Sequence, residues 1–442
     1  MRILRFLIVL FTAVTMPLFA PAQHHGYTFT QIASLDDYAG YFEPATLTNR
    51  GEVLFAPALL TGGDGEGVLL WRKGKLTTVA AGGQQMPDGG VLGYTLSPVA
   101  MNENGEVAFI MTRNHLDTPP PLGLNAGVYR YSHHTGVLPV MVPGLKGHGG
   151  NEFWGSYFVT SINNQGEIVF SGMICTSVLG TVPTVKCPDG SSTWMGMGVY
   201  KADAKGRISP VVLPGDVAPG GQNKSYFDLV RRPVINARGD VAFTAHVAGE
   251  PCEKADILFC LDSLFIKRGT SGVIERIATS GSASPVHGKN YSSAFGPVLN
   301  ASGDVVFIAD LSAAEDGSEV AVFLYRRGKK IVIAKPGDAM PGGGTFATCG
   351  DFTQNASLNN QGDIVFDATL KDGTNGIYLW RHGVVFLVAK NGTGTGAGVI
   401  STLDDFGGAV ANTQVSINDV GQILFAAKFK EGGGAMLVAT PK

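Results

Sequence analysis

The stretch Ile162-Asn163-Asn164-Gln165-Gly166-Glu167-Ile168-Val169-Phe170 decides the fold, because the same turn motif recurs along the whole chain. The motif reads apolar, Asn, two variable residues, Gly, acid, apolar, variable, Phe. It occurs seven times with small substitutions, and successive glycines are 54 to 73 residues apart. A repeat of this length, built from short strands and tight turns, predicts an all-β fold, a seven-bladed β-propeller of four-stranded antiparallel blades. The motif glycines are Gly51, Gly105, Gly166, Gly239, Gly303, Gly362 and Gly421, and the motif phenylalanines are Phe55, Phe109, Phe170, Phe243, Phe307, Phe366 and Phe425.

The domain organisation follows from the extent of the repeat. The chain has 442 residues, which is enough for several domains, but the repeat runs unbroken from 47 to 425. We therefore expect one propeller domain over 23–442, preceded by a signal peptide over 1–22. Residues 1–22 have arginines near the start, an apolar stretch over 6–19 and the small-x-small sequence Ala20-Pro21-Ala22. A membrane anchor is the alternative, although the apolar stretch is short for a span. The sequence thus predicts a protein that is secreted or periplasmic, without a membrane span in the mature chain.

Charge and cysteine content narrow the function classes. The net charge is −3, and it becomes −5 without the two signal arginines, so there is no basic face for nucleic acid. The five cysteines of an exported protein favour disulfides, and two close pairs are predicted. A metal site is the alternative, but no Cys-x-x-Cys or clustered His spacing supports it. We expect no cofactor. We also expect the protein to be a monomer. The predicted pairs are Cys175 with Cys187 and Cys252 with Cys260, which leaves Cys349 as a buried thiol.

Turn lengths place the strands within a blade. In the copy over 353–404, strands are expected at 363–368, 377–380 and 384–389, separated by turns too short to cross a sheet. The strand before each motif should therefore be innermost, and the strand before each long Pro-Gly-Asp loop outermost. The last copy ends one strand short, and 27–33 has the pattern of the missing outer strand, which would close the ring. The repeated Asn, Gly and Phe are interpreted as structural.

These motifs resemble the tandem Asn-x-x-Gly repeats of exported bacterial proteins, of which the HAF-type extracellular repeats are the nearest. The Pro-Gly-Asp-x-x-Pro-Gly-Gly loops resemble an uncharacterised family of secreted bacterial propellers. The resemblance covers about residues 27–440 and implies fold and export, without an activity. This chain departs from the HAF-type pattern by ending the motif in Phe rather than Gly, and by lacking a C-terminal anchor segment.

A binding site is expected where the copies differ. Long loops are predicted over 112–126, 173–197 and 246–262, all on the face opposite the motif turns, where they suit a binding surface or are tolerated variation. The residues four and five positions before each motif Asn are mixed and polar, and should face the central channel near these loops. Arginine there suits a carboxylate or sulfate, and the alternative is a water-filled channel. The candidate ligand-binding residues are Glu43, Arg231, Arg232, Gln354, Asn355 and Gln414.

The sequence favours a binding or scaffold module over an enzyme. Its partner would be a carbohydrate, an anionic polymer or another exported protein. The alternative is a polysaccharide lyase or glycoside hydrolase at the channel mouth, with Arg231 as neutralising group and His246 as base. Hydrolysis normally needs two carboxylates, and the predicted channel ring offers only Glu43. Asp310 matches His246 in the adjacent copy, and a structural pair is the favoured reading of these two.

Overall fold

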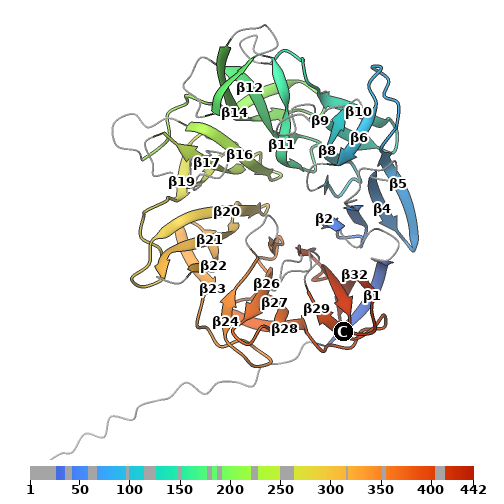
Figure 1. The fold of residues 1–442 in the computed structure, drawn as a ribbon, viewed down its shortest axis with the longest axis vertical. Helices are drawn as coiled ribbons and strands as arrows, with labels where there is room; N and C mark the ends of the chain where they lie inside the picture. The colour runs from blue at the N-terminus through green and yellow to red at the C-terminus, as the bar shows by residue number, and fades with distance from the viewer. Residues whose placement is uncertain are drawn as a thin grey trace, which may run out of the picture.

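The protein is an all-β propeller in which short sheets follow one another in chain order around a central axis (Figure 1). The structure is a computed structural model. Every regular element that it describes is a β-strand. The described residues include no helix that is long and apolar enough to cross a membrane. The described residues are 26–34, 42–57, 67–95, 99–113, 126–147, 152–176, 182–186, 192–220, 227–248, 263–314, 317–350, 355–403 and 414–442.

We number the seven copies of the turn motif in chain order. Five of the six sheets each contain one copy. Copy 1 forms β2 (Phe42–Leu47), β3 (Val53–Pro57), β4 (Gly67–Arg72) and β5 (Lys75–Ala81). Copy 2 forms β6 (Leu92–Thr95), β7 (Ala100–Met101), β8 (Val107–Arg113), β9 (Ala126–Ser132) and β10 (Gly136–Met141). Copy 5 forms β20 (Tyr291–Leu299), β21 (Val305–Ala314), β22 (Gly317–Arg326) and β23 (Lys329–Ala334). Copy 6 forms β24 (Phe346–Thr348), β25 (Ala356–Leu358), β26 (Ile364–Leu370), β27 (Asn375–Arg381) and β28 (Val384–Lys390). Copy 7 forms β29 (Ile400–Thr402), β30 (Ser416–Ile417), β31 (Ile423–Phe429) and β32 (Gly434–Pro441), joined by β1 (Tyr27–Ser34).

The sixth sheet has nine strands and contains copies 3 and 4. Copy 3 forms β11 (Phe153–Ile162), β12 (Ile168–Thr176), β13 (Val182–Lys186), β14 (Ser192–Ala202) and β15 (Ile208–Val212). Copy 4 forms β16 (Phe227–Ile235), β17 (Val241–Val247), β18 (Ser263–Lys267) and β19 (Ile274–Ala278). A single parallel pair, Met197 with Leu229, joins the two halves, whereas the pairing inside each half is antiparallel.

The N-terminal strand closes the ring, as the sequence predicted. β1 pairs antiparallel with β32, with Tyr27 opposite Pro441 and Ser34 opposite Ala435. This pairing covers the edge that the last copy would otherwise leave open. The predicted order of strands within a sheet is also confirmed for copies 1 and 5. In both, the strand before the motif lies at one edge of the sheet, and the later strands follow in chain order, as β2-β3-β4-β5 and β20-β21-β22-β23.

One loop prediction is wrong. The insertion expected over 173–197 is largely regular structure, because β12 and β14 extend beyond their counterparts and pair as far as Thr176 with Trp194, while β13 adds to β14. Cross-strand pairing satisfies the hydrogen-bonding needs of the backbone N–H and C=O groups in these strands, so much of the segment is regular sheet rather than loop. Residues 114–125 and 249–262 lie outside the described ranges, as does the predicted signal peptide. Cys187, Cys252 and Cys260 also lie outside them, so both disulfides stay predictions, while Cys349 is buried.

The motif phenylalanines form the core between neighbouring sheets. Phe366 stacks on its cross-strand partner Tyr378 at 5.8 Å, and both pack against Val306 and Ile308 of the preceding copy. Stacked pairs recur at Phe109 and its counterparts, and the motif phenylalanines are at most 1% exposed. Burial of these rings and their offset contacts explains why the motif ends in an aromatic residue.

Candidate functional site

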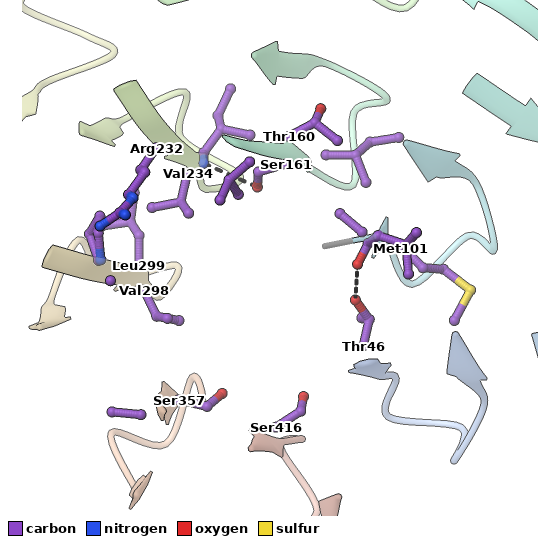
Figure 2. Close-up of a pocket in the computed structure, with 18 of the residues that line it drawn as sticks. Thr46, Met101, Thr160, Ser161, Arg232, Val234, Val298, Leu299, Ser357 and Ser416 are labelled. Carbon is purple, nitrogen blue, oxygen red and sulfur yellow. Dashed lines mark hydrogen bonds between the residues drawn. The ribbon is translucent and has the colours of Figure 1, made fainter. Parts of the chain in front are cut away.

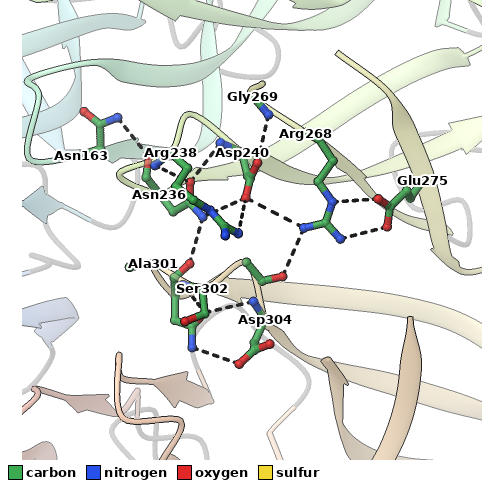
Figure 3. Close-up of polar contacts among 12 residues, drawn as sticks. Asn163, Asn236, Arg238, Asp240, Arg268, Gly269, Glu275, Ala301, Ser302 and Asp304 are labelled. Carbon is green, nitrogen blue, oxygen red and sulfur yellow. Dashed lines mark hydrogen bonds and ion pairs between the residues drawn. The ribbon is translucent and has the colours of Figure 1, made fainter. Parts of the chain in front are cut away.

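The motif asparagines are structural, and they link the copies into a belt. In copy 4, the side-chain oxygen of Asn236 accepts hydrogen bonds from the backbone N–H groups of Arg238 and Asp240, at 3.0 and 2.9 Å (Figure 3). Its Nδ2 donates to the carbonyl of Asn300 in copy 5, at 2.9 Å. The same link joins each motif asparagine to the next copy, at 2.8 to 3.3 Å, and Asn418 returns to Thr48 at 2.9 Å. The belt thus ties the innermost turns of consecutive copies together.

Copy 1 is the exception, because Thr48 stands where the other copies have asparagine. Its hydroxyl accepts the N–H of Glu52 at 3.1 Å, which caps the turn. A threonine has no amide to donate to copy 2, and there the backbone N–H of Asn49 bonds the Glu103 carboxylate instead, at 3.1 and 3.2 Å.

The motif acids are also structural, since each neutralises a cation at the end of the third strand of its sheet. Arg381 donates to Asp363 at 2.7 Å, and Arg326 donates to Asp304 at 2.9 Å. Burial raises the pKa of Asp240, but hydrogen bonds from Gly269, Asn236 and Arg238 outweigh it and hold that pKa below its usual range. The carboxylate of Asp240 is therefore held in the ionised state and is a poor candidate for acid catalysis.

The central channel contains a cavity of about 200 Å³, lined by the innermost strands of all seven copies (Figure 2). Its main ring comes from the residue two positions before each motif Asn, or Thr48 in copy 1. The ring members are small or branched, and several bond the adjacent strand, as Thr46 does to Val99 and Ser161 to Ile235. The sequence analysis missed this ring, although its mix of small polar side chains was the available signal. The ring consists of Thr46, Ala100, Ser161, Val234, Val298, Ser357 and Ser416.

Arg232 is the only charged side chain among the described residues that line the cavity. It lies at a β-bulge in β16, because Arg231 pairs with Thr244 and Val234 with Ala242, which leaves two residues opposite Phe243. The backbone of Arg232 is left-handed, with φ of 52°. Figure 2 shows its side chain beside Val298 and Leu299.

The equivalent bulge in β20 holds glycine. Gly296 also precedes a proline, has φ of 60° and also lines the cavity. Glycine adopts this conformation at little cost, whereas an arginine there is strained by about 1–3 kcal/mol, and the following Pro233 restricts it further. Of these two bulges, only the one in copy 4 therefore carries this strain.

Among the predicted ligand residues whose side chains the structure describes, Arg231, Asn355 and Gln414 are not part of the cavity lining. Arg231 is 3% exposed and does not line the cavity. Asn355 is buried and donates to Asp367 at 2.9 Å, inside the sheet of copy 6. Glu43 pairs with Ala56 through the backbone of β2. Gln414 is half-buried and outside the cavity lining, and Gln354 lies outside the described residues.

Of the residues named for the enzyme alternative, His246 lies near the end of β17 and Asp310 lies within β21. His246 is 4% exposed in β17, opposite Leu229 of β16. Asp310 in β21 accepts a hydrogen bond from the Ser293 hydroxyl at 2.8 Å. Their catalytic assignment stays a prediction.

The Pro-Gly-Asp loops use their aspartates to build the crossing. The carboxylate of Asp216 accepts the N–H of Leu213 at 2.8 Å, and that of Asp338 accepts the N–H of Lys335 at 3.0 Å. Among the described residues, no group of three His, Cys, Asp or Glu side chains could hold a metal ion.

Comparison with known proteins identifies a family and the fold. The model of a family of unknown function, DUF7453, matches residues 22–438. No curated protein matches the sequence. Among solved structures, the chain is similar to a puromycin-hydrolysing peptidase of Mycobacterium tuberculosis, with TM-score 0.50, 10% identity, and coverage of 95% of this chain and 55% of that one. At 10% identity this likeness shows the fold alone, and the chain spans about half the length of the peptidase.

Two further structures are similar at lower scores. The β-propeller domain of the Trilobed protease from Pyrococcus furiosus has TM-score 0.46 and 9% identity, with coverage of 90% of this chain and 92% of that one. The oligogalacturonate lyase of Vibrio parahaemolyticus has TM-score 0.46 and 11% identity, with coverage of 95% and 98%.

Proposed function

The chain belongs to this family of unknown function, DUF7453, and we propose that it is a binding module whose central cavity receives an acidic group of a carbohydrate, with Arg232 as the anchoring charge. The observation that carries the proposal is the left-handed backbone of Arg232 at a position where the adjacent copy has Gly296. Strain of this kind concentrates at binding sites, where a side chain is held for a purpose other than folding.

The surroundings of Arg232 favour recognition of one anionic group. The guanidinium forms paired, charge-assisted hydrogen bonds with carboxylates and sulfates. The rest of the lining is aliphatic or hydroxylic, and Ser161 offers a hydroxyl near a bound sugar. A cavity of about 200 Å³ is smaller than the roughly 300–1,000 Å³ of sites for drug-sized ligands. It suits a single sugar unit rather than a long segment.

Calorimetric titration with oligogalacturonate and with a neutral galacto-oligosaccharide of the same length tests this proposal. We expect the acidic ligand alone to bind, and Arg232→Gln to weaken it by roughly tenfold or more, the equivalent of one lost charge-assisted contact. Arg327→Gln is the matched control, since Arg327 is exposed and also has a left-handed backbone, in a hairpin on the motif-turn face. Equal binding of the two ligands, or full affinity in the Arg232 variant, refutes the proposal.

The same samples test the lyase alternative, because an unsaturated uronate product absorbs at 232 nm. We expect no new absorbance. The burial of His246 and Arg231, which are 4% and 3% exposed, supports a structural role for both. New absorbance that disappears in His246→Ala would establish a lyase and replace the binding proposal.

We further propose that the ring has seven blades, with the nine-stranded sheet counted as two, and that residues 23–442 form one exported domain. The belt of motif turns, with asparagine in six copies and Thr48 in copy 1, and the single bridge between copies 3 and 4 support the count. N-terminal sequencing of the protein recovered from the envelope and from the medium tests export. A start at Gln23 supports it, and an intact Met1 contradicts it.

A further inference from the structure

Copies 3 and 6 share an identical turn, Asn-Asn-Gln-Gly, but only copy 6 has an acid to complete it. In copy 6, Asn360 donates through its backbone N–H and its Nδ2 to the two carboxylate oxygens of Asp419, at 2.7 and 2.9 Å. Its side-chain oxygen meanwhile accepts the N–H of Ala301 in the preceding copy, at 2.8 Å. Asn360 is therefore a two-pronged carboxylate fork, oriented by its own amide oxygen.

Asn164 has the same orientation in copy 3. Its side-chain oxygen accepts the N–H of Glu103 at 3.0 Å, so its Nδ2 and backbone N–H face copy 4, as those of Asn360 face copy 7. The residue that corresponds to Asp419 is Ala237, which has no acceptor. Among the described residues, none accepts either donor of Asn164, although this turn is exposed and well placed for a ligand.

A groove of about 430 Å³ lies next to this junction. Its lining includes Ala237 and Gln165, the residue that follows Asn164, whereas Asn164 itself lies outside the lining. Two more departures from the repeat shape it. Arg130 and Arg268 reach the motif glycine carbonyl of the next copy, both at 3.3 Å, but Lys201 in copy 3 bonds Glu167 at 2.7 Å. The hairpin after Lys201 is also longer than the two-residue hairpins of copies 1, 5 and 6.

The lining of the groove has a net positive charge, although three of its four cations form ion pairs: Lys201 with Glu167 at 2.7 Å, Arg207 with Asp203 at 2.6 Å and Arg238 with Asp240 at 2.8 Å. Four cations line it against two acids, Glu167 and Asp203. Arg238, on the copy 4 side, is half-exposed while it bonds Asp240 (Figure 3), and Lys205 on the long hairpin is exposed. The lining cations are Lys201, Lys205, Arg207 and Arg238.

We propose that this groove binds a carboxylate of an acidic peptide segment of a protein partner, with Asn164 as the fork and the surrounding cations as the attracting field. The fork of copy 6 is the template, since it holds an aspartate carboxylate that is presented by a polypeptide turn. The site is on the motif-turn face and uses no residue of the central cavity, so it goes beyond the proposed carbohydrate binding.

Titration of the ¹⁵N-labelled protein with a blocked hexa-aspartate peptide tests the proposal directly. The backbone and side-chain amide resonances of Asn164 should shift, and blocked hexa-asparagine should not shift them. Ala237→Asp supplies the missing carboxylate internally, as Asp419 does, and should weaken peptide binding by roughly tenfold or more. Lys205→Gln, at an exposed side chain, should weaken binding severalfold without changing the fork.

Ala301→Asp is the matched control, because it adds the same charge at the next junction, and it should leave peptide affinity unchanged. Arg232→Gly should also leave it unchanged, so failure here and failure of the cavity proposal are distinguishable. The proposal is overturned if Asn164 does not shift at millimolar peptide, or if Ala237→Asp binds as tightly as the wild type. A shift with oligogalacturonate but not with peptide overturns the assignment to a protein partner.

Discussion

The belt predicts that one asparagine contributes far more stability than the threonine that occupies the same position in copy 1. Asn236 is 5% exposed and forms four hydrogen bonds, two as acceptor from backbone N–H groups and two as donor, to Asp240 and to the Asn300 carbonyl. At a net value of about 1 kcal/mol each, and with buried partners left unsatisfied, Asn236→Ala should reduce the free energy of unfolding by about 3–4 kcal/mol. Thr48→Ala removes one such bond and should cost about 1 kcal/mol.

Urea unfolding followed by tryptophan fluorescence compares the two variants. Equal slopes against denaturant concentration would show that the same surface unfolds in both, so that the midpoints report stability alone. The belt explanation is refuted if the Asn236 variant loses no more stability than the Thr48 variant.

Three other outcomes follow from the same contacts. The pKa values of Asp240 and Glu167 are lowered in the fold, so their stabilisation is complete above their unfolded pKa values, 3.8 and 4.5, and is lost as pH falls through the lowered values. The urea concentration at the unfolding midpoint should stay constant from about pH 7 to 5 and fall below about pH 4, with a smaller fall in Asp240→Asn. An equal fall in that variant would contradict the contribution of the Asp240 carboxylate. Thr48→Asn should supply the missing link to the Asn102 carbonyl and raise the unfolding free energy by about 1 kcal/mol, measured in urea, and no gain would show that the belt is not limiting there. Deletion of residues 27–34 should expose the edge of β32 and cause association detectable by light scattering, whereas a monomer of unchanged stability would contradict the closing role of that strand.

Much of the fold follows from local sequence signals. Gly362 has φ of 84°, as its turn requires, and Phe366 is fully buried, so the residues that repeat are those that the ring needs. The outer strand at 27–34 was identifiable because the last copy lacked one. By contrast, the extension of β12 and β14 arises from pairing between segments that carry no turn signal of their own.

The site was less predictable, because strand alternation fails at a bulge. Arg231 and Arg232 are neighbours in one candidate column, yet at the bulge Arg231 is buried away from the cavity lining and Arg232 is part of it. Asn355 holds the position of Arg232 in copy 6, but the chain bends there and the side chain turns to Asp367. The left-handed backbone of Arg232 accompanies the bulge opposite β17 and has no signal in sequence beyond the following proline.

The sequence signal for the fork at Asn164 can be recognised only once the order of the copies around the ring is known. Aligning the copies shows the same four residues at 163–166 and 359–362, followed one copy later by Ala237 in one case and Asp419 in the other. Which copy faces which is a property of the closed ring, so the missing acid gains meaning from the structure.

Arg232→Gly tests the central claim most directly, with thermal stability and oligogalacturonate affinity measured on one preparation. Glycine suits the left-handed backbone, as it does at Gly296, so the variant should be as stable as the wild type or more stable by up to about 1 kcal/mol, while affinity falls roughly tenfold or more. Arg327→Gly is the control in a hairpin, and it should keep the thermal stability and the oligogalacturonate affinity of the wild type. Retained affinity in the Arg232 variant, or a loss of stability that accounts for the loss of binding, would contradict the claim that this arginine is held in strain to bind a ligand.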